Sequence, residues 1–252
     1  MLYIVATPIG NLEDISLRAL RILGEVDFVL CEDTRVTKKL LEYYKVKTKT
    51  ISYHQHSGIK KQDYLLGLLE AGKDLALVSD AGTPGISDPG GKLVSAVIEK
   101  FGESIKIESV PGPSAVTAAL SISGIATDKF IFLGFPPHKK GRQKFLQKIV
   151  DSIFPVVIYE SKHRILKFLE ELKKINQNIV KHNQEIDEQK SKDIIRPKNL
   201  PRKINLITSV VVCRELSKMH ETVYRGELSD VIDKIKNSHN DQRGEFVVIV
   251  GR

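Results

Sequence analysis

The segment 75–91, LALVSDAGTPGISDPGG, places the strongest constraint on how this chain folds. It opens with four apolar residues, a length typical of a buried parallel strand, and continues into small, turn-forming residues from Ser79 onward. Residues 90–101 resume an apolar pattern that predicts a helix. Because loops at the carboxyl ends of strands form the ligand crevice of an open α/β sheet, the segment predicts a ligand-binding loop.

The residues of this loop limit what it can bind. Gly82 and Gly85 allow a close backbone approach or a positive φ, and Asp80 can accept hydrogen bonds or attract a cation. The loop contains no Lys or Arg, so the phosphate-binding pattern G-x-x-x-x-G-K-[ST] is missing. A small ligand with hydroxyl, amine or positive character therefore fits better than a triphosphate. A plain strand-to-helix turn is the alternative that these residues alone leave open.

Apolar runs alternate with amphipathic segments through the first half of the chain. The runs that predict strands lie at 2–6, 27–31, 49–53, 75–78 and 105–110. Ser16 and Thr34 are predicted to cap the helices that follow them. This alternation is typical of βαβ units, and it predicts a mostly parallel sheet with crossover helices on both faces.

A domain boundary is expected near residue 128, so that residues 1–128 and 129–252 form two α/β domains. The predicted strands of the second domain lie at 130–135, 156–160, 205–213, 222–225 and 245–250. Residues 176–203 interrupt this pattern with seven Lys or Arg, four Asp or Glu and no strand-length apolar run. They predict a polar insertion that is flexible or partly helical.

The net charge of +8 is unevenly distributed along the chain. Residues 1–128 contain 14 Lys or Arg and 16 Asp or Glu, whereas residues 129–252 contain 25 and 15. A near-neutral first half and a strongly basic second half indicate that the second half meets a polyanion. A Lys-rich solvated surface without a partner is the alternative, because charge patterning by itself is a weak functional signal.

The composition argues against several classes of protein. No run approaches the roughly 18 apolar residues of a membrane helix, so no membrane partner is expected. The apolar N-terminus lacks a basic region and is predicted to be a strand rather than a signal peptide. Cys31 and Cys213 are far apart and form no C-x-x-C pair. This pattern predicts no disulfide scaffold and no metal site, and it favours a cytoplasmic location.

Eight motifs, in the expected order, resemble those of the tetrapyrrole (corrin/porphyrin) methylase superfamily. They are TPIGNLEDISLRAL at 7–20, CEDTRVTKKLL at 31–41, ISYHQHS at 51–57, SDAGTPGISDPG at 79–90, VPGPSAVTAAL at 110–120, YESKHR at 159–164, CRELSKMHE at 213–221 and GEFVVIV at 244–250. The resemblance covers residues 2–251 and is interrupted only at 176–203, which is longer and more polar than usual. It implies two α/β domains, the first with a mostly parallel sheet and the second with a mixed sheet, and S-adenosylmethionine in the cleft between them.

The resemblance assigns the contacts of this cofactor to loops that follow strands. S-adenosylmethionine carries no phosphate, which agrees with a loop that has an acid but no Lys or Arg. The implied residues are Pro8, Asp80, Ala81, Gly82, Thr83, Pro84, Ile86, Ser87, Ser114, Ala115, Phe135 and Pro136. Of these, Pro8 is expected to shape the floor of the cleft, and Phe135 and Pro136 are expected to come from the second domain.

The first three motifs resemble one branch of the superfamily, whose members methylate the ribose 2′-hydroxyl of a cytidine in small-subunit (16S) rRNA. A hydroxyl is a poor nucleophile until its proton leaves, so a nearby base or a strong hydrogen-bond acceptor helps. Asp33 or Glu32 is expected to accept this proton, and His54 to share that role or to bind the ribose. Arg35 would bind the adjacent phosphate with its planar guanidinium, and His56 would also contact the substrate.

Substrate binding is expected to follow the charge of the second half. Lys139, Lys140 and Arg142, together with Lys144, can contact rRNA phosphates. Four further charged residues are expected to brace the domain interface or to line the substrate cleft: Glu160, Arg164, Arg214 and Glu215. The expected partner is 16S rRNA or the assembled 30S subunit, and the resemblance implies a homodimer.

Three other functions compete with this interpretation. The first is a methyltransferase of the same superfamily that acts on a porphyrinoid or a protein side chain, against which the basic second half and the EDTR and YHQH stretches argue. The second is a non-catalytic RNA-binding protein with the same fold. The third, a dinucleotide-binding oxidoreductase, is disfavoured because G-x-G-x-x-G does not follow the first predicted strand.

Overall fold

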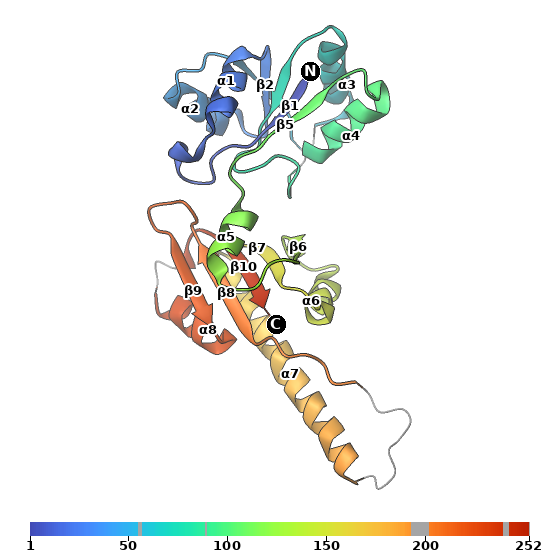
Figure 1. The fold of residues 1–252 in the computed structure, drawn as a ribbon, viewed down its shortest axis with the longest axis vertical. Coiled ribbons are helices and arrows are strands. Elements are labelled where there is room, and N and C mark those ends of the chain that lie inside the picture. The colour runs from blue at the N-terminus through green and yellow to red at the C-terminus, as the bar shows by residue number, and fades with distance from the viewer. Residues whose placement is uncertain (55–56, 89, 193–201, 239–241, 252) are drawn as a thin grey trace. The chain divides into compact units, whose positions relative to one another are not determined.

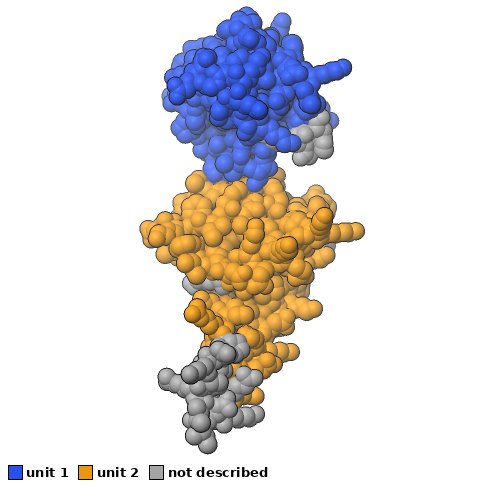
Figure 2. Space-filling model, turned by 90° about the vertical axis from the view of Figure 1, so that its right-hand side faces the viewer, with its two compact units in different colours: residues 1–115 blue, residues 116–252 orange. Residues whose placement is uncertain are grey.

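The computed structural model divides into two compact units, Met1–Ala115 and Val116–Arg252, which are coloured in Figure 2. It describes residues 1–54, 57–88, 90–192, 202–238 and 242–251. Each unit contains one five-stranded sheet. Both sheets carry helices, so each unit is an α/β unit, as the resemblance implied.

The division between the units falls earlier in the chain than the boundary expected near residue 128. Helix α5 (Ala115–Ser123) accounts for this difference, because it packs with the second unit. The Arg225 guanidinium donates hydrogen bonds to the carbonyl oxygens of Ile122 and Ser123. Nearly all of α5 therefore belongs to the second unit.

The first unit contains a fully parallel sheet with the strand order β3-β2-β4-β1-β5, which confirms the parallel sheet predicted for the first half. Its strands are β1 (Leu2–Val5), β2 (Phe28–Cys31), β3 (Lys49–Ser52), β4 (Leu75–Leu77) and β5 (Ile107–Val110). Strand β4 is central and is flanked by β2 and β1. The loops after these three strands therefore leave the same edge of the sheet side by side.

Helices cover both faces of this sheet (Figure 1). They are α1 (Leu17–Glu25), α2 (Thr34–Tyr43), α3 (Ile59–Glu70) and α4 (Gly90–Phe101), with a short 3₁₀ helix η1 (Leu12–Asp14) before α1. Successive side chains of a strand point to opposite faces. Leu75 and Leu77 pack in a core with α3 and α4, whereas Ala76 and Val78 pack in a core with α1 and α2.

The two predicted helix caps have different outcomes. The Ser16 hydroxyl accepts a hydrogen bond from the Ala19 N–H at 3.1 Å, which confirms Ser16 as the cap of α1. The prediction of Thr34 as the cap of α2 is wrong, because Asp33 occupies that position. Asp33 has an extended backbone and its carboxylate accepts from the Arg35 N–H at 2.8 Å, while Thr34 is already helical.

The second unit contains a mixed sheet with the order β6-β7-β10-β8-β9, in which only β6 and β7 are paired in parallel. Its strands are β6 (Ile131–Gly134), β7 (Val156–Ser161), β8 (Ser209–Arg214), β9 (Thr222–Gly226) and β10 (Glu245–Gly251). Its other helices are α6 (Arg142–Asp151), α7 (Ile165–Lys192) and α8 (Leu228–Asn237). Alternate residues of β10, such as Phe246 and Val248, join one hydrophobic core with these three helices.

Most of the expected polar insertion is helix, because α7 continues to Lys192. Two asparagines seven residues apart on α7 hold the returning chain. The Asn176 side chain exchanges two hydrogen bonds with the backbone of Ile207, at 2.9 and 3.1 Å. Asn183 makes the same paired contact with the backbone of Ile204, at 2.8 and 3.0 Å. Residues 193–201 of the expected insertion lie outside the described residues.

None of the helices in the described ranges combines the length and the apolar character that crossing a bilayer requires.

Asn176→Ala removes both side-chain hydrogen bonds to the peptide groups of Ile207, whose side chain is buried. Leaving buried polar groups unpaired costs about 1–3 kcal/mol, so we expect the free energy of unfolding to fall by that amount in urea denaturation. Asn178 is exposed on the same helix, and Asn178→Ala should change stability by less than about 0.5 kcal/mol. Equal effects of the two substitutions would contradict the role given to Asn176.

Candidate functional site

The loop after β4 is tied to the loop after β1 at the carboxyl edge of the first sheet. Thr7 pairs with Gly82 through both backbone groups, at N···O distances of 2.9 and 3.0 Å. The Thr7 hydroxyl also donates to the carbonyl oxygen of Ser79 at 3.2 Å. Pro8 follows Thr7 and is buried. Sequence reasoning identified Pro8 but missed Thr7, which makes the contacts.

Two further hydrogen bonds bring the loops after β2 and β5 to the same place. The Asp33 N–H donates to Asp80 Oδ1 at 3.1 Å, and the Thr83 hydroxyl donates to the Pro113 carbonyl at 3.2 Å. Four loops therefore adjoin at the edge where an open parallel sheet binds its ligands. The expected cofactor contacts of the first unit lie on three of these loops or, for Ala115, at the helical residue that follows: Pro8, Asp80, Ala81, Gly82, Thr83, Pro84, Ile86, Ser87, Ser114 and Ala115.

The loop after β4 has an unusual backbone that a carboxylate holds in place. Gly82, Gly85 and Ser87 have φ values of 79°, 87° and 66°, in the left-handed region that favours glycine. Asp88 Oδ1 accepts hydrogen bonds from the N–H groups of Gly85 and Gly90, both at 2.7 Å. Asp88 thereby closes the loop. Sequence reasoning missed this residue, although an Asp in a turn-forming stretch is typical of such side-chain to backbone contacts.

The chemistry of this loop suits a ligand without phosphate. Residues 79–88 contain two carboxylates, Asp80 and Asp88, and no Lys or Arg. The side chains that the loop exposes are those of Asp80, Ala81, Ile86 and Ser87. An exposed carboxylate can hold a cationic or hydroxyl-bearing group, whereas it would repel a phosphate.

A cavity of about 560 Å³ opens beside this loop at the ends of β2, β3 and β4. It is lined by Glu32, Asp33, Thr34, Arg35, Ser52, His54 and Asp80. Four residues predicted for catalysis or substrate binding therefore line one cavity. They follow strands β2 and β3 in the chain and are Glu32, Asp33, Arg35 and His54. His56, the other residue of the first unit predicted for substrate binding, lies outside the described residues.

The pKa values of the two neighbouring carboxyl groups in this cavity are shifted in opposite directions. Burial, followed by the negative charges of Asp80 and Asp88, raises the pKa of Glu32 above its ordinary value, which a charge on His54 partly offsets. The side chain and backbone of Arg35 lower the pKa of Asp33 to about 2. Glu32 is therefore the better proton acceptor, because a carboxylate with a pKa near 2 binds a proton poorly.

Asp33 and Arg35 form a local ion pair at the start of α2. The Arg35 guanidinium donates through Nε and Nη2 to the Asp33 carboxylate, with a shortest N···O distance of 2.6 Å. The Arg35 side chain is 87% exposed, so the pair lies at the rim of the cavity. Its remaining N–H groups face solvent and can reach an anion.

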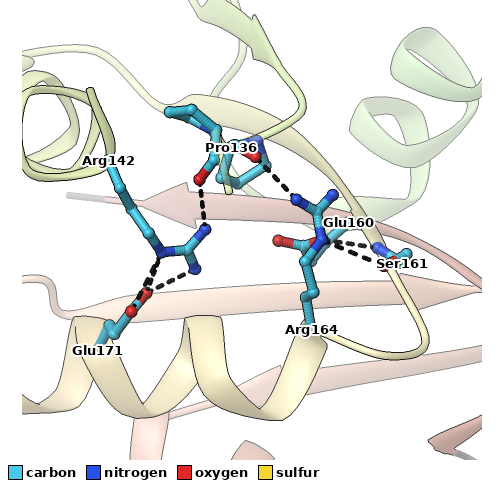
Figure 3. A network of polar contacts seen from close by, with 7 residues as sticks. Pro136, Arg142, Glu160, Ser161, Arg164 and Glu171 are labelled. Atoms are coloured by element: carbon cyan, nitrogen blue, oxygen red, sulfur yellow. Dashed lines mark hydrogen bonds and ion pairs between the residues drawn. The ribbon is translucent and has the colours of Figure 1, made fainter. Parts of the chain in front are cut away.

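In the second unit, Arg142 holds the loop after β6 instead of facing solvent (Figure 3). Its guanidinium makes a two-pronged ion pair with Glu171, at 2.6 and 2.9 Å, and donates to the Pro137 carbonyl at 3.0 Å. Arg142 is 8% exposed. Its expected role as a phosphate contact is therefore corrected, because its charge is neutralised inside the protein, whereas Lys139 and Lys140 are exposed.

Arg164 holds the same loop from a second side (Figure 3). It pairs with Glu160 Oε1 at 2.8 Å and donates to the Pro136 carbonyl at 3.0 Å. Glu160 is buried, and this burial raises the pKa of its carboxyl group. The loop presents Phe135, which is 51% exposed and whose ring lies 5.4 Å from that of Tyr159.

Arg214 and Glu215 also form hydrogen bonds with backbone groups of neighbouring loops and strands. The buried Arg214 guanidinium donates to the carbonyl oxygens of Arg243 and His220, at 2.7 and 3.0 Å. Glu215 Oε1 accepts from the Glu245 N–H at 2.8 Å. The described residues contain no group of three or more His, Cys, Asp or Glu side chains that could bind a metal ion.

Comparisons with known proteins agree with these features. The family model of the Tetrapyrrole (Corrin/Porphyrin) Methylases matches residues 1–232. A "Ribosomal RNA small subunit methyltransferase I" of Hydrogenobaculum sp. is 40% identical over 253 residues, which cover 100% of this chain and 95% of the relative. The protein of the same name from Thermotoga maritima is 38% identical, covering 99% of this chain and 97% of the relative.

Solved structures show the same fold. A cobalt precorrin-4 methyltransferase superposes with a TM-score of 0.62 at 20% sequence identity, covering 99% of this chain and 94% of that one. Identity at this level supports the two-sheet α/β fold and carries no information about the substrate.

Gly90 and Gly91 provide a matched test of how tightly the loop after β4 is packed. A Cβ at Gly90 would lie 2.8 Å from the Gly85 nitrogen and 2.9 Å from Asp88 Oδ1, whereas a Cβ at Gly91 meets nothing within 4 Å. We expect Gly90→Ala to lower stability by about 1–3 kcal/mol in thermal or urea unfolding. Gly91→Ala should be neutral or stabilising, because Ala favours a helix more than Gly does. Destabilisation by both substitutions alike would contradict the packing argument.

The raised pKa of Glu32 can be tested through its neighbour Asp80. Asp80→Asn removes a negative charge that opposes ionisation of Glu32, so the pKa of Glu32 should fall toward its ordinary value. The change is measured by NMR titration of the carboxyl carbon. Asp63→Asn, at an exposed position of α3, is the control and should leave this pKa unchanged. An unchanged pKa in Asp80→Asn would show that Asp80 does not act on Glu32.

Proposed function

Because the chain belongs to the Tetrapyrrole (Corrin/Porphyrin) Methylases, we propose that it is an S-adenosylmethionine-dependent methyltransferase of small-subunit ribosomal RNA. Relatives that are 37–40% identical over nearly its whole length carry the name of such an enzyme, which supports an rRNA substrate. The acceptor we propose is the ribose 2′-hydroxyl of a cytidine in 16S rRNA. The observation that carries the proposal is Glu32, a carboxyl group of raised pKa in a cavity beside the loop after β4.

The loop after β4 fits S-adenosylmethionine. This cofactor would supply an electrophilic methyl group on a sulfonium, and it has hydroxyl and amine groups but no phosphate. The exposed Asp80 carboxylate and the backbone of residues 81–84 can hold such groups. Ser87, Ser114 and Ala115 are the further contacts that we propose in the first unit, and Phe135 and Pro136 those in the second.

Glu32 is proposed as the general base. Removal of the 2′-hydroxyl proton makes the ribose oxygen a better nucleophile, and the proton passes from this oxygen to the Glu32 carboxylate. Only the ionised carboxylate can accept it. Turnover should therefore decline as the pH falls through the raised pKa of Glu32, at a higher pH than an ordinary glutamate would give.

The other residues of the cavity are proposed to bind and orient the substrate. Asp33 caps α2 and fixes the Arg35 guanidinium, which would contact the phosphate next to the acceptor ribose. His54 lies in the same cavity and would bind the ribose. Holding two reactants in line can contribute roughly 7–11 kcal/mol to lowering the barrier, so contacts that orient the substrate add to the effect of the base.

The substrate and setting of the enzyme are also part of the proposal. Lys139 and Lys140 on the exposed loop after β6 would contact rRNA phosphates in the 30S subunit. We propose a homodimer, as the family resemblance implies. We also propose a cytoplasmic location, which the two buried free cysteines, Cys31 and Cys213, support.

The proposed function is tested by transfer of tritium from labelled S-adenosylmethionine to unmethylated 30S subunits, with mass-spectrometric mapping of 2′-O-methyl groups. We expect one methylated cytidine in 16S rRNA. Transfer to a porphyrinoid but not to rRNA would identify a different methyltransferase. Binding of rRNA without transfer would identify a non-catalytic protein.

Glu32→Gln and Asp33→Asn separate the two candidate bases. General bases contribute typically 10²–10⁴-fold, so Glu32→Gln should lower kcat by at least about 100-fold while S-adenosylmethionine still binds. Asp33→Asn should lower kcat far less, because Asn also caps a helix and the pKa of Asp33 is already about 2. The reverse order of effects in single-turnover assays would assign the base to Asp33.

A further inference from the structure

We infer that helix α2 and the turn after it form a second RNA-binding surface, which begins at the cavity of the first unit. We call it the α2 surface, and it consists of Arg35, Lys38, Lys39, Lys45 and Lys47. The group that it would recognise is the phosphate backbone of the RNA on either side of the acceptor nucleotide. This inference rests on the proposed function, because it takes the substrate to be RNA.

The first unit is nearly neutral in total, but its sequence contains a basic segment and an acidic remainder. Residues 34–49, TRVTKKLLEYYKVKTK, contain six Lys or Arg and one Glu. The rest of the unit, residues 1–33 and 50–115, contains eight Lys or Arg and fourteen Asp or Glu. Segregation of this kind produces a local positive potential that the total charge of the unit conceals.

The basic residues of α2 and one acidic residue, Glu42, lie on one exposed face of this helix. Arg35, Lys38, Lys39 and Glu42 are spaced at i, i+3, i+4 and i+7, which places them along one side of the helix. All four are exposed, whereas Leu41 is 3% exposed and packs in the core on the other side of the helix. The backbone that carries these charges is therefore ordered before RNA binds.

Among the described residues, no carboxylate forms an ion pair with the lysines of the α2 surface. Elsewhere in the first unit, three lysines form ion pairs at 2.7–2.9 Å: Lys73 with Asp27, Lys100 with Glu70, and Lys106 with Glu108. Within the described part of the chain, Lys38, Lys39, Lys45 and Lys47 make no such pair. Lysines without carboxylate partners keep a full positive charge for RNA phosphates, and neutralising those phosphates releases the counterions condensed on the RNA.

The α2 surface is continuous with the proposed active site. Arg35 lines the cavity and stands in the first turn of α2, so the basic face runs directly from the cavity along the helix. The ten residues of α2 extend this face over about 15 Å. A strand of RNA whose acceptor ribose reaches Glu32 would therefore have its neighbouring phosphates next to Lys38 and Lys39.

An exposed aromatic ring stands at the end of this face. Tyr43 is 61% exposed, and its ring lies 4.9 Å from that of Tyr44, edge to face. Tyr44 is anchored by a hydrogen bond from its hydroxyl to the Leu12 carbonyl. A fixed, exposed ring among lysines is the combination on which proteins stack the bases of single-stranded RNA.

The test compares two pairs of lysines on opposite faces of the same sheet. Lys38→Gln/Lys39→Gln alters the α2 surface, and Lys60→Gln/Lys92→Gln removes the same charge from exposed positions on α3 and α4. Gln and Lys favour a helix about equally, so both pairs should fold. Each variant is titrated with unmethylated 30S subunits at several salt concentrations, alongside titration with S-adenosylmethionine.

We expect the Lys38→Gln/Lys39→Gln protein to bind 30S subunits about tenfold more weakly, with a salt slope shallower by about 1–2. Its affinity for S-adenosylmethionine should match that of the unaltered protein. The Lys60→Gln/Lys92→Gln protein should bind 30S subunits normally, and Glu42→Gln should bind them more tightly.

Two outcomes overturn the inference, and they can be told apart. If the unaltered protein methylates rRNA while both lysine pairs bind 30S subunits with equal affinity and salt slope, the α2 surface is not an RNA contact and the proposed function stands. If the unaltered protein neither binds nor methylates 30S subunits, the proposed function fails together with the inference.

Discussion

The pairing of β2 with β4 is the constraint on which the candidate site depends. These strands are neighbours in the sheet although β3 separates them along the chain, and their register sets Leu30 beside Leu77. The loops that follow them therefore emerge together, and the Asp33 N–H reaches the Asp80 carboxylate at 3.1 Å. This one adjacency places an acid-bearing loop of glycines next to the cavity that contains Glu32. Without this pairing, Glu32 would lack the nearby Asp80 carboxylate that helps to raise its pKa.

Charged residues in this protein divide into those that hold loops and those that remain available. Asp33 caps a helix and binds Arg35. The buried Arg142 and the partly buried Arg164 each donate to a carbonyl oxygen of the loop after β6. Their charges are largely satisfied within the protein. Glu32 is different, because burial and nearby carboxylates raise its pKa instead of fixing its charge. A charged residue is thus available for catalysis or binding only where no ion pair within the protein already neutralises its charge. The sequence motif alone does not reveal such pairs.

Much of the fold could be predicted from the sequence, because buried parallel strands are short apolar runs and their ends carry turn residues. The loop after β4 was identified in this way, including the positive φ of Gly82 and Gly85. The sequence could not show that the pKa of Glu32 is raised, since this depends first on its burial and then on the charges of Asp80 and Asp88, which lie far along the chain. The polar segment was predicted to be flexible or partly helical, and α7 does continue through it to Lys192. The contacts that hold this part of α7 could not be predicted. Its asparagines satisfy backbone groups of residues far along the chain, and no local periodicity encodes that partner.

Amide hydrogen exchange with and without S-adenosylmethionine tests the central claim most directly, because it locates the bound cofactor on the chain. The account predicts slower exchange in peptides that span residues 79–88 and 112–115, since the loops after β4 and β5 adjoin through the bond from Thr83 to Pro113. Unchanged exchange in both segments at a saturating concentration of S-adenosylmethionine would contradict it.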